Sequence, residues 1–416
     1  MPLRILHFAD AHIDMVNYGR QDPSTGLPIR VMDFLKSLDT IVDTAITEEV
    51  DLVLFAGDAY KDRTPSPTYQ REWGKRIMRL SKAGIPTILL VGNHDLSPSL
   101  GRAHAIQEFD TLEIPYIHVA ARPSILTPSE LGIQLQVIAI PWVSRSEFIA
   151  AWNLTGAESK DAYEKMEERI TKRVQDWLSK LDEKIPTILC AHASIQGAKY
   201  GNEQTVMLGV DVFLPGSLVK DPRLDYVALG HLHKAQDLNK DSQPPVVYSG
   251  SIERIDFGEA KDEKFFILAN VEKGKTTIEW IKLDQIRPFH DLRISLSKEF
   301  GDIGKQIQDS LPPKNEIRDA IIRLTIEYPR DMESFINEKA IRKDAADALS
   351  LQIIRRPIME TRVRIPTDHA VSDYSPMELL DLYWNTIDMD LDDREEINNL
   401  AKEIISLNES DEPGEM

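Results

Sequence analysis

Residues 87–95 read TILLVGNHD, five β-branched or aliphatic residues followed at once by glycine, asparagine, histidine and aspartate. The first five favour a buried β-strand, because such side chains pack well on a pleated sheet. Gly92 allows the backbone to bend where this strand ends. The stretch therefore predicts a strand whose carboxyl end presents Asn93, His94 and Asp95.

The same arrangement recurs at four other places, where an apolar run ends in a cluster of oxygen and imidazole groups. Apolar residues with helical spacing lie between these runs, at 31–48, 68–82 and 160–181. Buried strands with helical crossovers indicate a layered α/β sandwich, in which the carboxyl ends of the strands line one crevice. We therefore expect all five clusters to meet in that crevice. Besides the cluster at 92–95, they are Asp10-Ala11-His12, Gly57-Asp58, Ala191-His192-Ala193 and Gly230-His231-Leu232-His233.

The residue types in these clusters are those that bind divalent metal ions. Alternate residues of an extended chain point the same way, so a D-x-H or H-x-H segment offers two ligands to one ion. Mixed carboxylate, amide and imidazole ligands suit Mn²⁺, Fe²⁺, Zn²⁺ or Co²⁺ better than Mg²⁺ or Ca²⁺. A carboxylate shared by two ions roughly 3.5–4 Å apart would hold them as a clamp on a phosphoryl group. The pattern predicts a two-metal phosphoesterase.

In the order D-x-H, GD, GNHD, H and GH-x-H, the clusters resemble those of the calcineurin-like metallophosphoesterase family. The resemblance implies a four-layer α/β/β/α metallophosphoesterase sandwich and two divalent ions, with Mn²⁺ the expected metal. It implies that His94 stabilises the transition state or protonates the leaving oxygen, and that Asp95 orients His94; a helix N-cap is the alternative role for Asp95. The implied ligands are Asp10, His12, Asp58 and His233 for the first ion, and Asp58, Asn93, His192 and His231 for the second.

Two longer stretches, 57–66 (GDAYKDRTPS) and 248–259 (YSGSIERIDFGE), resemble the SbcD/Mre-type nucleases within that superfamily. This narrower resemblance implies a DNA exonuclease and endonuclease of double-strand-break repair. It also implies an SbcC/Rad-type ATPase partner and a homodimer that forms a heterotetramer. One position departs from the pattern: many of these nucleases have a second histidine where this chain has Lys61. A lysine binds phosphate as a point charge but is a poor general acid, so the efficiency of duplex degradation is in doubt.

Composition changes character after about residue 286, which indicates three domains: 1–285 for the metallophosphoesterase, 286–366 for a small α+β capping domain, and 367–416 for a helical tail. The capping domain is expected to read strand 291–296, helix 298–310, strand 320–328, helix 332–349 and strand 350–355. The family resemblance gives this domain a role in binding DNA. Candidate DNA contacts are Lys61, Arg63, Arg355 and Arg356, the last two having a solvated edge strand as the alternative.

The tail has its own helix signals. Ser375-Pro376-Met377-Glu378 provides a cap, a proline at the first helical position and an acidic residue at the third. A second amphipathic helix is expected from about residue 392, followed by an acidic end at 408–416. Two interpretations remain open: the two tail helices pack on their own domain, or residues 375–407 dock on the ATPase.

The chain carries a net charge of -19, of which residues 367–416 contribute -13, so its acidity does not exclude DNA as a substrate. No run of eighteen apolar residues is present, which excludes a membrane-spanning helix. The single cysteine, Cys190, excludes an internal disulfide and suits a reducing cytoplasm. The resemblance to SbcD/Mre-type nucleases implies a cytoplasmic protein associated with the nucleoid. Two further functions remain open: a small-molecule phosphodiesterase or protein phosphatase of the same fold, and a non-catalytic scaffold for the ATPase.

The positions or roles of three further residues near the strands are also predicted. His7 is expected to lie in the core or behind the metal ligands. Trp142 either lines the cleft or packs in the core, and Asp14 is a weak candidate for assisting the first cluster.

Overall fold

The computed structural model describes residues 2–96, 102–144, 148–149, 162–200, 213–297, 301–358, 374–384, 394 and 397–402. The chain divides into two compact units, and the division runs through one three-stranded sheet, so both units contain parts of it. The domain boundaries expected after residues 285 and 366 stay predictions. The first unit comprises Met1–Asp291, Pro312–Arg323 and Ala345–Gln352, and the second comprises Leu292–Leu311, Leu324–Asp344 and Ile353–Met416.

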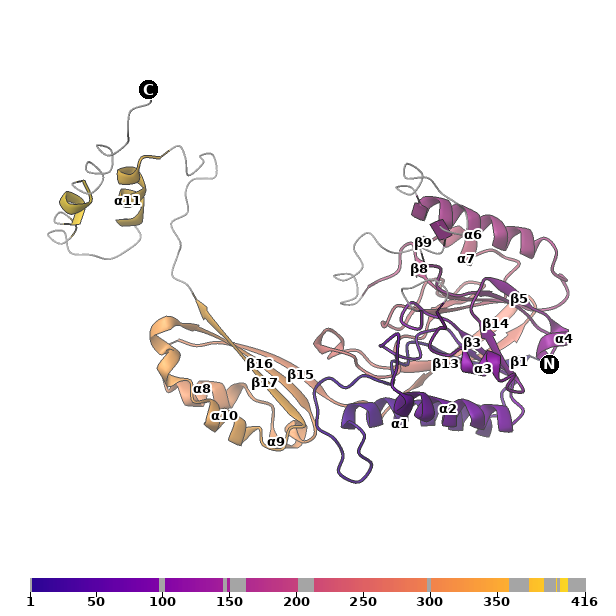
Figure 1. Ribbon diagram of the computed structural model, residues 1–416, viewed down its shortest axis with the longest axis horizontal. Coiled ribbons are helices and arrows are strands. Elements are labelled where there is room, and N and C mark those ends of the chain that lie inside the picture. The colour runs from indigo at the N-terminus through magenta and orange to yellow at the C-terminus, as the bar shows by residue number, and fades with distance from the viewer. Residues whose placement is uncertain are drawn as a thin grey trace. The chain divides into compact units, whose positions relative to one another are not determined.

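Two six-stranded sheets form the body of the first unit (Figure 1). The first has the order β14-β13-β1-β2-β3-β4 and the second the order β11-β12-β10-β7-β6-β5. Strands β1 to β4 run parallel to one another, as do β6, β7, β10 and β12. The strands are β1 Leu3–Phe8, β2 Leu52–Phe55, β3 Thr87–Leu90, β4 Ile117–Ala120, β5 Ser124–Leu126, β6 Gln136–Ile140, β7 Thr187–His192, β10 Tyr226–Gly230, β11 Gln236–Asp237, β12 Val246–Tyr248, β13 Phe265–Glu272 and β14 Lys275–Lys282, with a small pair β8 Ser194–Ile195 and β9 Phe213–Leu214.

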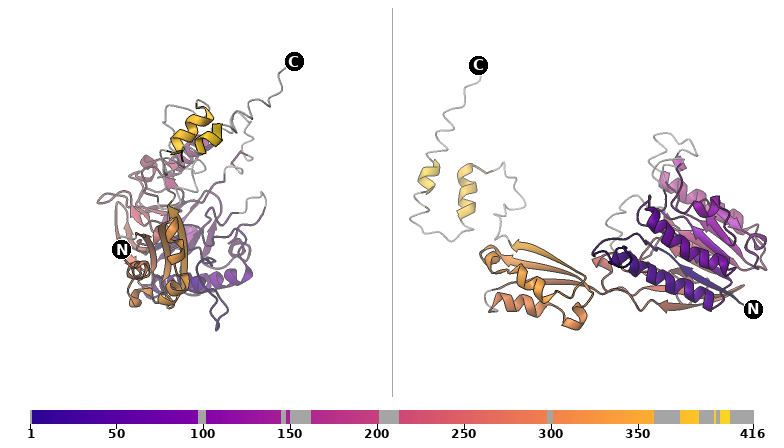
Figure 2. Two further views of the ribbon diagram at one scale, coloured as in Figure 1. Left: turned by 90° about the vertical axis from the view of Figure 1, so that its left-hand side faces the viewer. Right: turned by 60° about the horizontal axis from the view of Figure 1, so that its bottom comes forward.

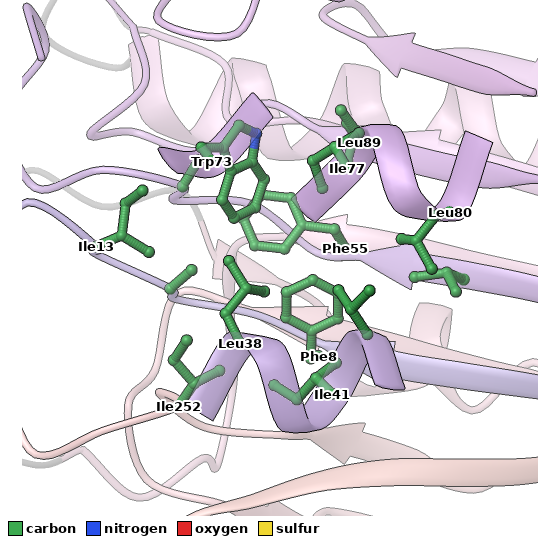
Figure 3. Close-up of a cluster of buried hydrophobic side chains, with 14 of the residues drawn as sticks. Phe8, Ile13, Leu38, Ile41, Phe55, Trp73, Ile77, Leu80, Leu89 and Ile252 are labelled. Atoms are coloured by element: carbon green, nitrogen blue, oxygen red, sulfur yellow. The ribbon is translucent and has the colours of Figure 1, made fainter. Parts of the chain in front are cut away.

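Three apolar layers hold these elements together, which confirms the predicted α/β/β/α sandwich. One cluster contains inward residues of both sheets, such as Ile5 and Val137, and fills the space between them. A second joins the first sheet to α1 and α2, and a third joins the second sheet to α6 and α7. Figure 3 shows the second cluster, where Phe8 and Phe55 of the sheet meet Leu38 and Ile41 of α1 and Trp73 and Ile77 of α2.

The helices that cover the first sheet form where apolar residues recur at helical spacing. The buried face of α1 (Ile29–Thr47) includes Val31, Phe34, Leu38 and Ile41. Helix α2 (Pro67–Lys82) begins with a proline at the first position, where its missing N–H costs no hydrogen bond. The two lie side by side in both figures (Figures 1 and 2). Other helical segments of this unit are α3 Glu108–Thr111, α4 Pro128–Leu131, α6 Ala162–Leu178, α7 Gly216–Val219, η3 Phe257–Glu259 and α9 Lys314–Ile317.

The two sheets approach closely near their carboxyl ends. A Cβ atom at Gly230 would overlap the carbonyl oxygen of Ala56, so no larger residue fits there. His7 is fully buried beside this point: its Nδ1 lies 2.9 Å from the Tyr226 hydroxyl, and its Nε2 lies 3.2 Å from the Leu229 carbonyl oxygen. Since that carbonyl can only accept, Nε2–H donates to it. His7 therefore links β1 to β10 across the interior.

Replacing His7 with glutamine is expected to weaken the dependence of folding stability on pH. Burial lowers the pKa of His7 to about 3, whereas in the unfolded chain its pKa is about 6.5. Between these values the unfolded chain binds a proton that the folded protein does not, so stability falls as the pH decreases from about 6.5 to 3. Each unit of pKa difference is worth about 1.4 kcal/mol.

The measurement is urea unfolding of the two proteins at pH 8 and pH 5. At pH 8 the wild type is expected to be the more stable, because glutamine does not reproduce both hydrogen bonds. At pH 5 this advantage should shrink. An equal difference at both pH values would contradict the role of His7.

A three-stranded sheet, in the order β15-β16-β17, follows the sandwich along the chain. Helices α8 and α10 lie side by side along it (Figure 1). The predicted strands are confirmed within a few residues. The helix predicted at 298–310 begins later, at Ile303, because the Asp302 side chain caps it there, and residues 298–300 lie outside the described residues. The expected continuous helix at 332–349 is wrong, because extended backbone at Ile336 separates a 3₁₀ turn from a shorter helix. The elements are β15 Phe289–Ser295, α8 Ile303–Ser310, β16 Ile321–Pro329, η5 Arg330–Phe335, α10 Glu338–Asp344 and β17 Ser350–Ile358.

The first predicted tail helix is present as α11 (Pro376–Trp384). Its capping box is formed: the Ser375 main-chain N–H donates to a Glu378 carboxylate oxygen at 2.7 Å, and the Glu378 N–H donates to Ser375 Oγ at 3.3 Å. Most of the second predicted helix and the acidic end at 408–416 lie outside the described residues. Within the described part of the chain, every helix is too short or too polar to cross a bilayer.

Candidate metal centre

The first group of predicted ligands comes together from the ends of β1 and β10. Ligand atoms of Asp10, His12 and His233 all lie within 4.8 Å of one another. The Nε2 atoms of His12 and His233 are 3.2 Å apart. The His231 main-chain N–H also donates to both carboxylate oxygens of Asp10, at 3.0 and 3.1 Å, which ties the end of β10 to the loop after β1.

The hydrogen bonds of Nδ1 in His12 and His233 determine whether Nε2 of each ring can bind a metal ion. His12 Nδ1 lies 3.2 Å from the Tyr60 carbonyl oxygen, and His233 Nδ1 lies 2.9 Å from a Glu259 carboxylate oxygen. Both partners are acceptors, so each Nδ1 carries the hydrogen and each neutral ring turns a lone pair inward at Nε2. Two lone pairs 3.2 Å apart, facing the Asp10 carboxylate, repel unless a cation lies between them. The residues present therefore fit a bound metal ion.

The second group is organised around Asp58. Ligand atoms of Asp10, Asp58 and His192 lie within 4.8 Å of one another. His192 Nδ1–H donates to the Ala56 carbonyl oxygen at 2.7 Å, which leaves Nε2 facing Asp58 Oδ2 at 3.4 Å. The side-chain oxygen of Asn93 lies 3.0 Å from His192 Nε2 and 3.1 Å from His231 Nδ1. This group brings together the predicted ligands of the second ion, and it also includes Asp10, which was predicted for the first ion only.

Asp58 lies between the two groups, as a bridging carboxylate must. Its Oδ2 is 3.8 Å from His12 Nε2 on one side and 3.4 Å from His192 Nε2 on the other. Burial opposes its ionisation, but the neighbouring imidazoles outweigh burial and hold the pKa of Asp58 well below its usual range. Although burial lowers the pKa of His192, the Asp58 carboxylate raises it to about 9. A metal ion would take the place of that proton.

The backbone around the centre is strained, as functional sites often are. A Cβ atom at Gly57 would overlap Nδ1 of His192, and one at Gly92 would overlap Oδ1 of Asp58. These two glycines therefore allow the backbone to approach the ligands closely. Four non-glycine ligands have left-handed backbone: Asp10 (φ 50°), His12 (38°), Asp58 (63°) and His231 (96°).

His94 stands at the edge of the metal ligands. Its ring meets the His12 ring edge-on, with centroids 5.1 Å apart. The Nδ1–H of His94 donates to the Lys61 carbonyl oxygen at 2.9 Å, which leaves Nε2 for a substrate atom. The main chain of Lys61 therefore holds the ring, while the Lys61 side chain is exposed.

Asp95 has different partners from those that the resemblance implied. Its carboxylate is buried and accepts the main-chain N–H groups of Asp58 and Ala59, both at 3.0 Å, and of Gly92 at 2.9 Å. The carboxylate thus ties the loops after β2 and β3 together. The His94 ring is held by the Lys61 carbonyl oxygen instead, so the effect of Asp95 on His94 passes through the backbone of these loops.

Asp14 likewise acts on a loop rather than on the first cluster. Its carboxylate accepts the Lys61 N–H at 2.5 Å and the Asp62 N–H at 2.9 Å.

Trp142 lies over the second group, with its ring centroid 4.9 Å from that of His231. Trp142 is half-buried and its ring also meets that of His192, with centroids 6.2 Å apart, so it packs against two of the predicted ligands.

The candidate DNA contacts fall in separate places. Lys61 and Arg63 lie with His94 around one pocket. Arg355 and Arg356 are both exposed residues of the edge strand β17, and Arg355 pairs with Glu338 at 2.8 Å.

Sequence reasoning missed a buried ion pair behind the first group. Glu259, which accepts from His233, also pairs through its other oxygen with Lys264 Nζ at 2.5 Å. Lys264 is 1% exposed and donates to Ser251 Oγ at 2.7 Å as well. Burial opposes ionisation of Glu259, but Lys264 and His233 hold its pKa well below the usual range. The signal was an acidic residue at the end of the 248–259 stretch, followed by a lysine directly before an apolar strand.

Glu259→Gln is expected to lower the affinity for the first metal ion by about 10- to 100-fold, because the carboxylate that orients a ligating histidine is lost. It should also destabilise the fold, since Lys264 would be a buried charge without its partner. The matched control is Glu259→Gln combined with Lys264→Met, which removes both charges. We expect the double variant to recover stability but not metal affinity, as measured by thermal unfolding and Mn²⁺ titration calorimetry. Normal metal affinity in the single variant would contradict the role of Glu259.

Several known proteins are similar to this chain. A family model described as calcineurin-like phosphoesterase matches residues 3–235. The SbcD subunit of the nuclease SbcCD from Escherichia coli (strain K12) is 26% identical over 306 residues, which cover 71% of this chain and 72% of that subunit. A dimetal phosphatase structure from Danio rerio matches with a TM-score of 0.41 and 11% identity, over 68% of this chain and 98% of its own. A structure from Thermus thermophilus matches with a TM-score of 0.36 and 13% identity, over 67% of this chain and 99% of its own.

Proposed function

Since the chain belongs to the calcineurin-like phosphoesterase family, we propose that it is a two-metal DNA nuclease with exonuclease and endonuclease activity. We infer that it acts with an SbcC/Rad-type ATPase in DNA end processing and double-strand-break repair. The observation that carries the hydrolytic part is the facing pair of Nε2 atoms, 3.2 Å apart, beside a carboxylate that reaches both ligand groups. The choice of DNA is supported by 26% identity to a nuclease subunit over most of both chains.

The metal ligands define the electrostatics of the reaction. Asp10, His12, Asp58 and His233 would hold one ion, and Asp58, Asn93, His192 and His231 the other. Two divalent ions bound there would supply a nucleophile near neutral pH and neutralise charge on the phosphoryl group. Mn²⁺ is the proposed metal, because the ligand set mixes carboxylates, an amide and imidazoles.

The remaining side chains act on protons and on position. With Nδ1 occupied by the Lys61 carbonyl oxygen, His94 can donate a proton to the leaving oxygen from Nε2. Asp95 keeps the loops of Asp58 and Asn93 in place through three backbone amides. The exposed ammonium of Lys61 would attract the DNA backbone as a point charge.

The other regions are assigned to binding. Residues 286–366 are proposed as the capping domain that positions DNA, with Arg356 the better contact because Arg355 is engaged by Glu338. Residues 375–407 are proposed to dock on the ATPase. Support comes from the exposed apolar side chains of this segment, Tyr383, Ile397 and Leu400. We further propose that the chain forms a homodimer, that this dimer forms a heterotetramer with the ATPase, and that the complex lies in the cytoplasm at the nucleoid.

The test is a Mn²⁺-dependent assay on labelled single-stranded and hairpin DNA, with and without the ATPase partner and ATP. Cleavage that requires Mn²⁺ supports the nuclease. If bis-p-nitrophenyl phosphate is hydrolysed but no DNA is cut under any condition, the protein is a phosphodiesterase for other substrates. If neither is hydrolysed although metal binds, a scaffold role is favoured.

The partner is tested separately by deleting residues 370–416 and measuring co-purification with the ATPase. We expect binding to be lost while Mn²⁺-dependent hydrolysis of bis-p-nitrophenyl phosphate continues, because the deleted residues contain none of the ligands. Unchanged co-purification would show that the tail packs elsewhere.

A further inference from the structure

A pocket of about 630 Å³ opens beside His94 on the first unit. Three chain segments line it: residues 14–17 after β1, residues 61–66 after β2 with Tyr69 of α2, and His94 itself. Its volume lies within the roughly 300–1,000 Å³ typical of ligand sites. None of the roles proposed above for the metal ligands uses this space.

The wall of the pocket is held in place by hydrogen bonds. The Asp14 carboxylate accepts two consecutive main-chain N–H groups, of Lys61 and Asp62, and so holds the loop where the pocket begins. The Asp62 carboxylate in turn accepts from the N–H of Thr64 at 3.1 Å and its hydroxyl at 3.2 Å. Because the Asp14 carboxylate binds the neighbouring loop and the Asp62 carboxylate binds donors of its own loop, both loops hold the pocket wall without a ligand.

The position of His94 indicates which part of a substrate enters the pocket. One side of its ring meets His12, a metal ligand, while the ring also forms part of the pocket wall. In an in-line displacement the leaving oxygen departs opposite the nucleophile. If the nucleophile arises at the metal ligands and His94 protonates the leaving oxygen, the leaving group extends past His94, away from those ligands.

We propose that this pocket binds the nucleotide on the leaving side of the scissile phosphate. The proposal rests on the nuclease function proposed above and names a subsite of it. Tyr69 is half-buried at the pocket wall and offers a ring on which a base can stack. Lys61 and Arg63 are exposed cations at the same pocket and would attract the next phosphate along the strand.

The experiment uses single-stranded oligonucleotides that contain one phosphodiester among phosphorothioate linkages. One substrate has both flanking bases, one lacks the base on the leaving side, and one lacks the base on the other side. The products identify the leaving side, because the phosphate stays with the other fragment. The proteins are the wild type, Tyr69→Ala, Tyr69→Phe and, as a matched control, Tyr116→Ala, an exposed tyrosine just before β4.

Tyr69→Ala is expected to raise KM about tenfold for the complete substrate and for the one that lacks the other base. It should have no further effect once the leaving-side base is absent. Tyr69→Phe should behave as the wild type because it keeps the ring, and Tyr116→Ala should change nothing. Arg63→Gln should raise KM at low salt for all three substrates, with less effect at high salt.

Two results would overturn the subsite while leaving the nuclease intact: no change of KM in Tyr69→Ala, or an equal change for all three substrates. A wild type that hydrolyses bis-p-nitrophenyl phosphate but cuts none of the oligonucleotides would instead remove the proposed function, and the subsite with it.

Discussion

His94→Ala is expected to lower kcat for DNA cleavage by about 10²- to 10⁴-fold, the range for a lost general acid, while metal binding is retained. The metal ligands do not depend on the His94 ring, whose Nδ1 donates to the Lys61 carbonyl oxygen. No histidine stands at position 61 to replace it. Single-turnover cleavage and Mn²⁺ titration calorimetry measure the two properties separately.

The leaving group offers a sharper test of the same variant. If His94 donates a proton to the leaving oxygen, its loss should matter far less for bis-p-nitrophenyl phosphate, since p-nitrophenolate departs without protonation. His118→Gln, on β4 and remote from the ligands, is the matched histidine control. Equal losses on DNA and on the activated ester would assign His94 to transition-state stabilisation, and full activity of His94→Ala would exclude any catalytic role.

Asp58→Asn is expected to reduce the affinity for both metal ions by more than about 100-fold. Loss of an outer carboxylate alone costs about 10- to 100-fold, and Asp58 is the carboxylate that reaches the ligand nitrogens of His12 and His192. Metal content after dialysis, measured by elemental analysis, should fall from two ions per chain toward none. DNA cleavage should fall with it.

Unfolding of metal-free Asp58→Asn, compared with the metal-free wild type, shows whether the variant loses metal because a ligand is missing or because the fold is lost. The asparagine keeps an oxygen for the His94 main-chain N–H, which donates to Asp58 Oδ1 at 2.8 Å. It also removes one of two buried carboxylates that lie close together, the other being Asp10. This relief of repulsion is opposed by the loss of the imidazole contacts that favour the ionised carboxylate, so the metal-free variant should stay folded and unfold somewhat earlier than the metal-free wild type. Asp43→Asn on α1, an exposed position, is the control. Retention of two ions by Asp58→Asn would contradict the bridging role.

The lysine at position 61, where many related nucleases have histidine, has a defined structural setting. The main-chain carbonyl of Lys61 holds the His94 ring, and this contact does not depend on the side chain. The Asp14 carboxylate positions that carbonyl through the neighbouring N–H groups. A change of side chain at position 61 therefore alters what faces the substrate but not how His94 is held.

The sequence by itself determined the sandwich and the set of candidate ligands. Runs such as TILLV predict buried strands, and the polar clusters directly after them must gather where the parallel strands end. Local patterns alone are enough to predict that Asp58, Asn93 and His192 lie together, although they are up to 134 positions apart. The prediction of a helix at 332–349 was wrong, because apolar spacing does not reveal the extended backbone at Ile336.

Only the tertiary structure decided which group each side chain contacts. The partner of His233 is Glu259, whose own partner Lys264 directly precedes β13, and no spacing rule links the three. Asp95 was expected at His94 but accepts backbone amides from two loops, because three N–H groups converge on its carboxylate. Local sequence specifies where a strand ends. The hydrogen-bond partners of a buried charge depend on which other chain segments the fold brings beside it.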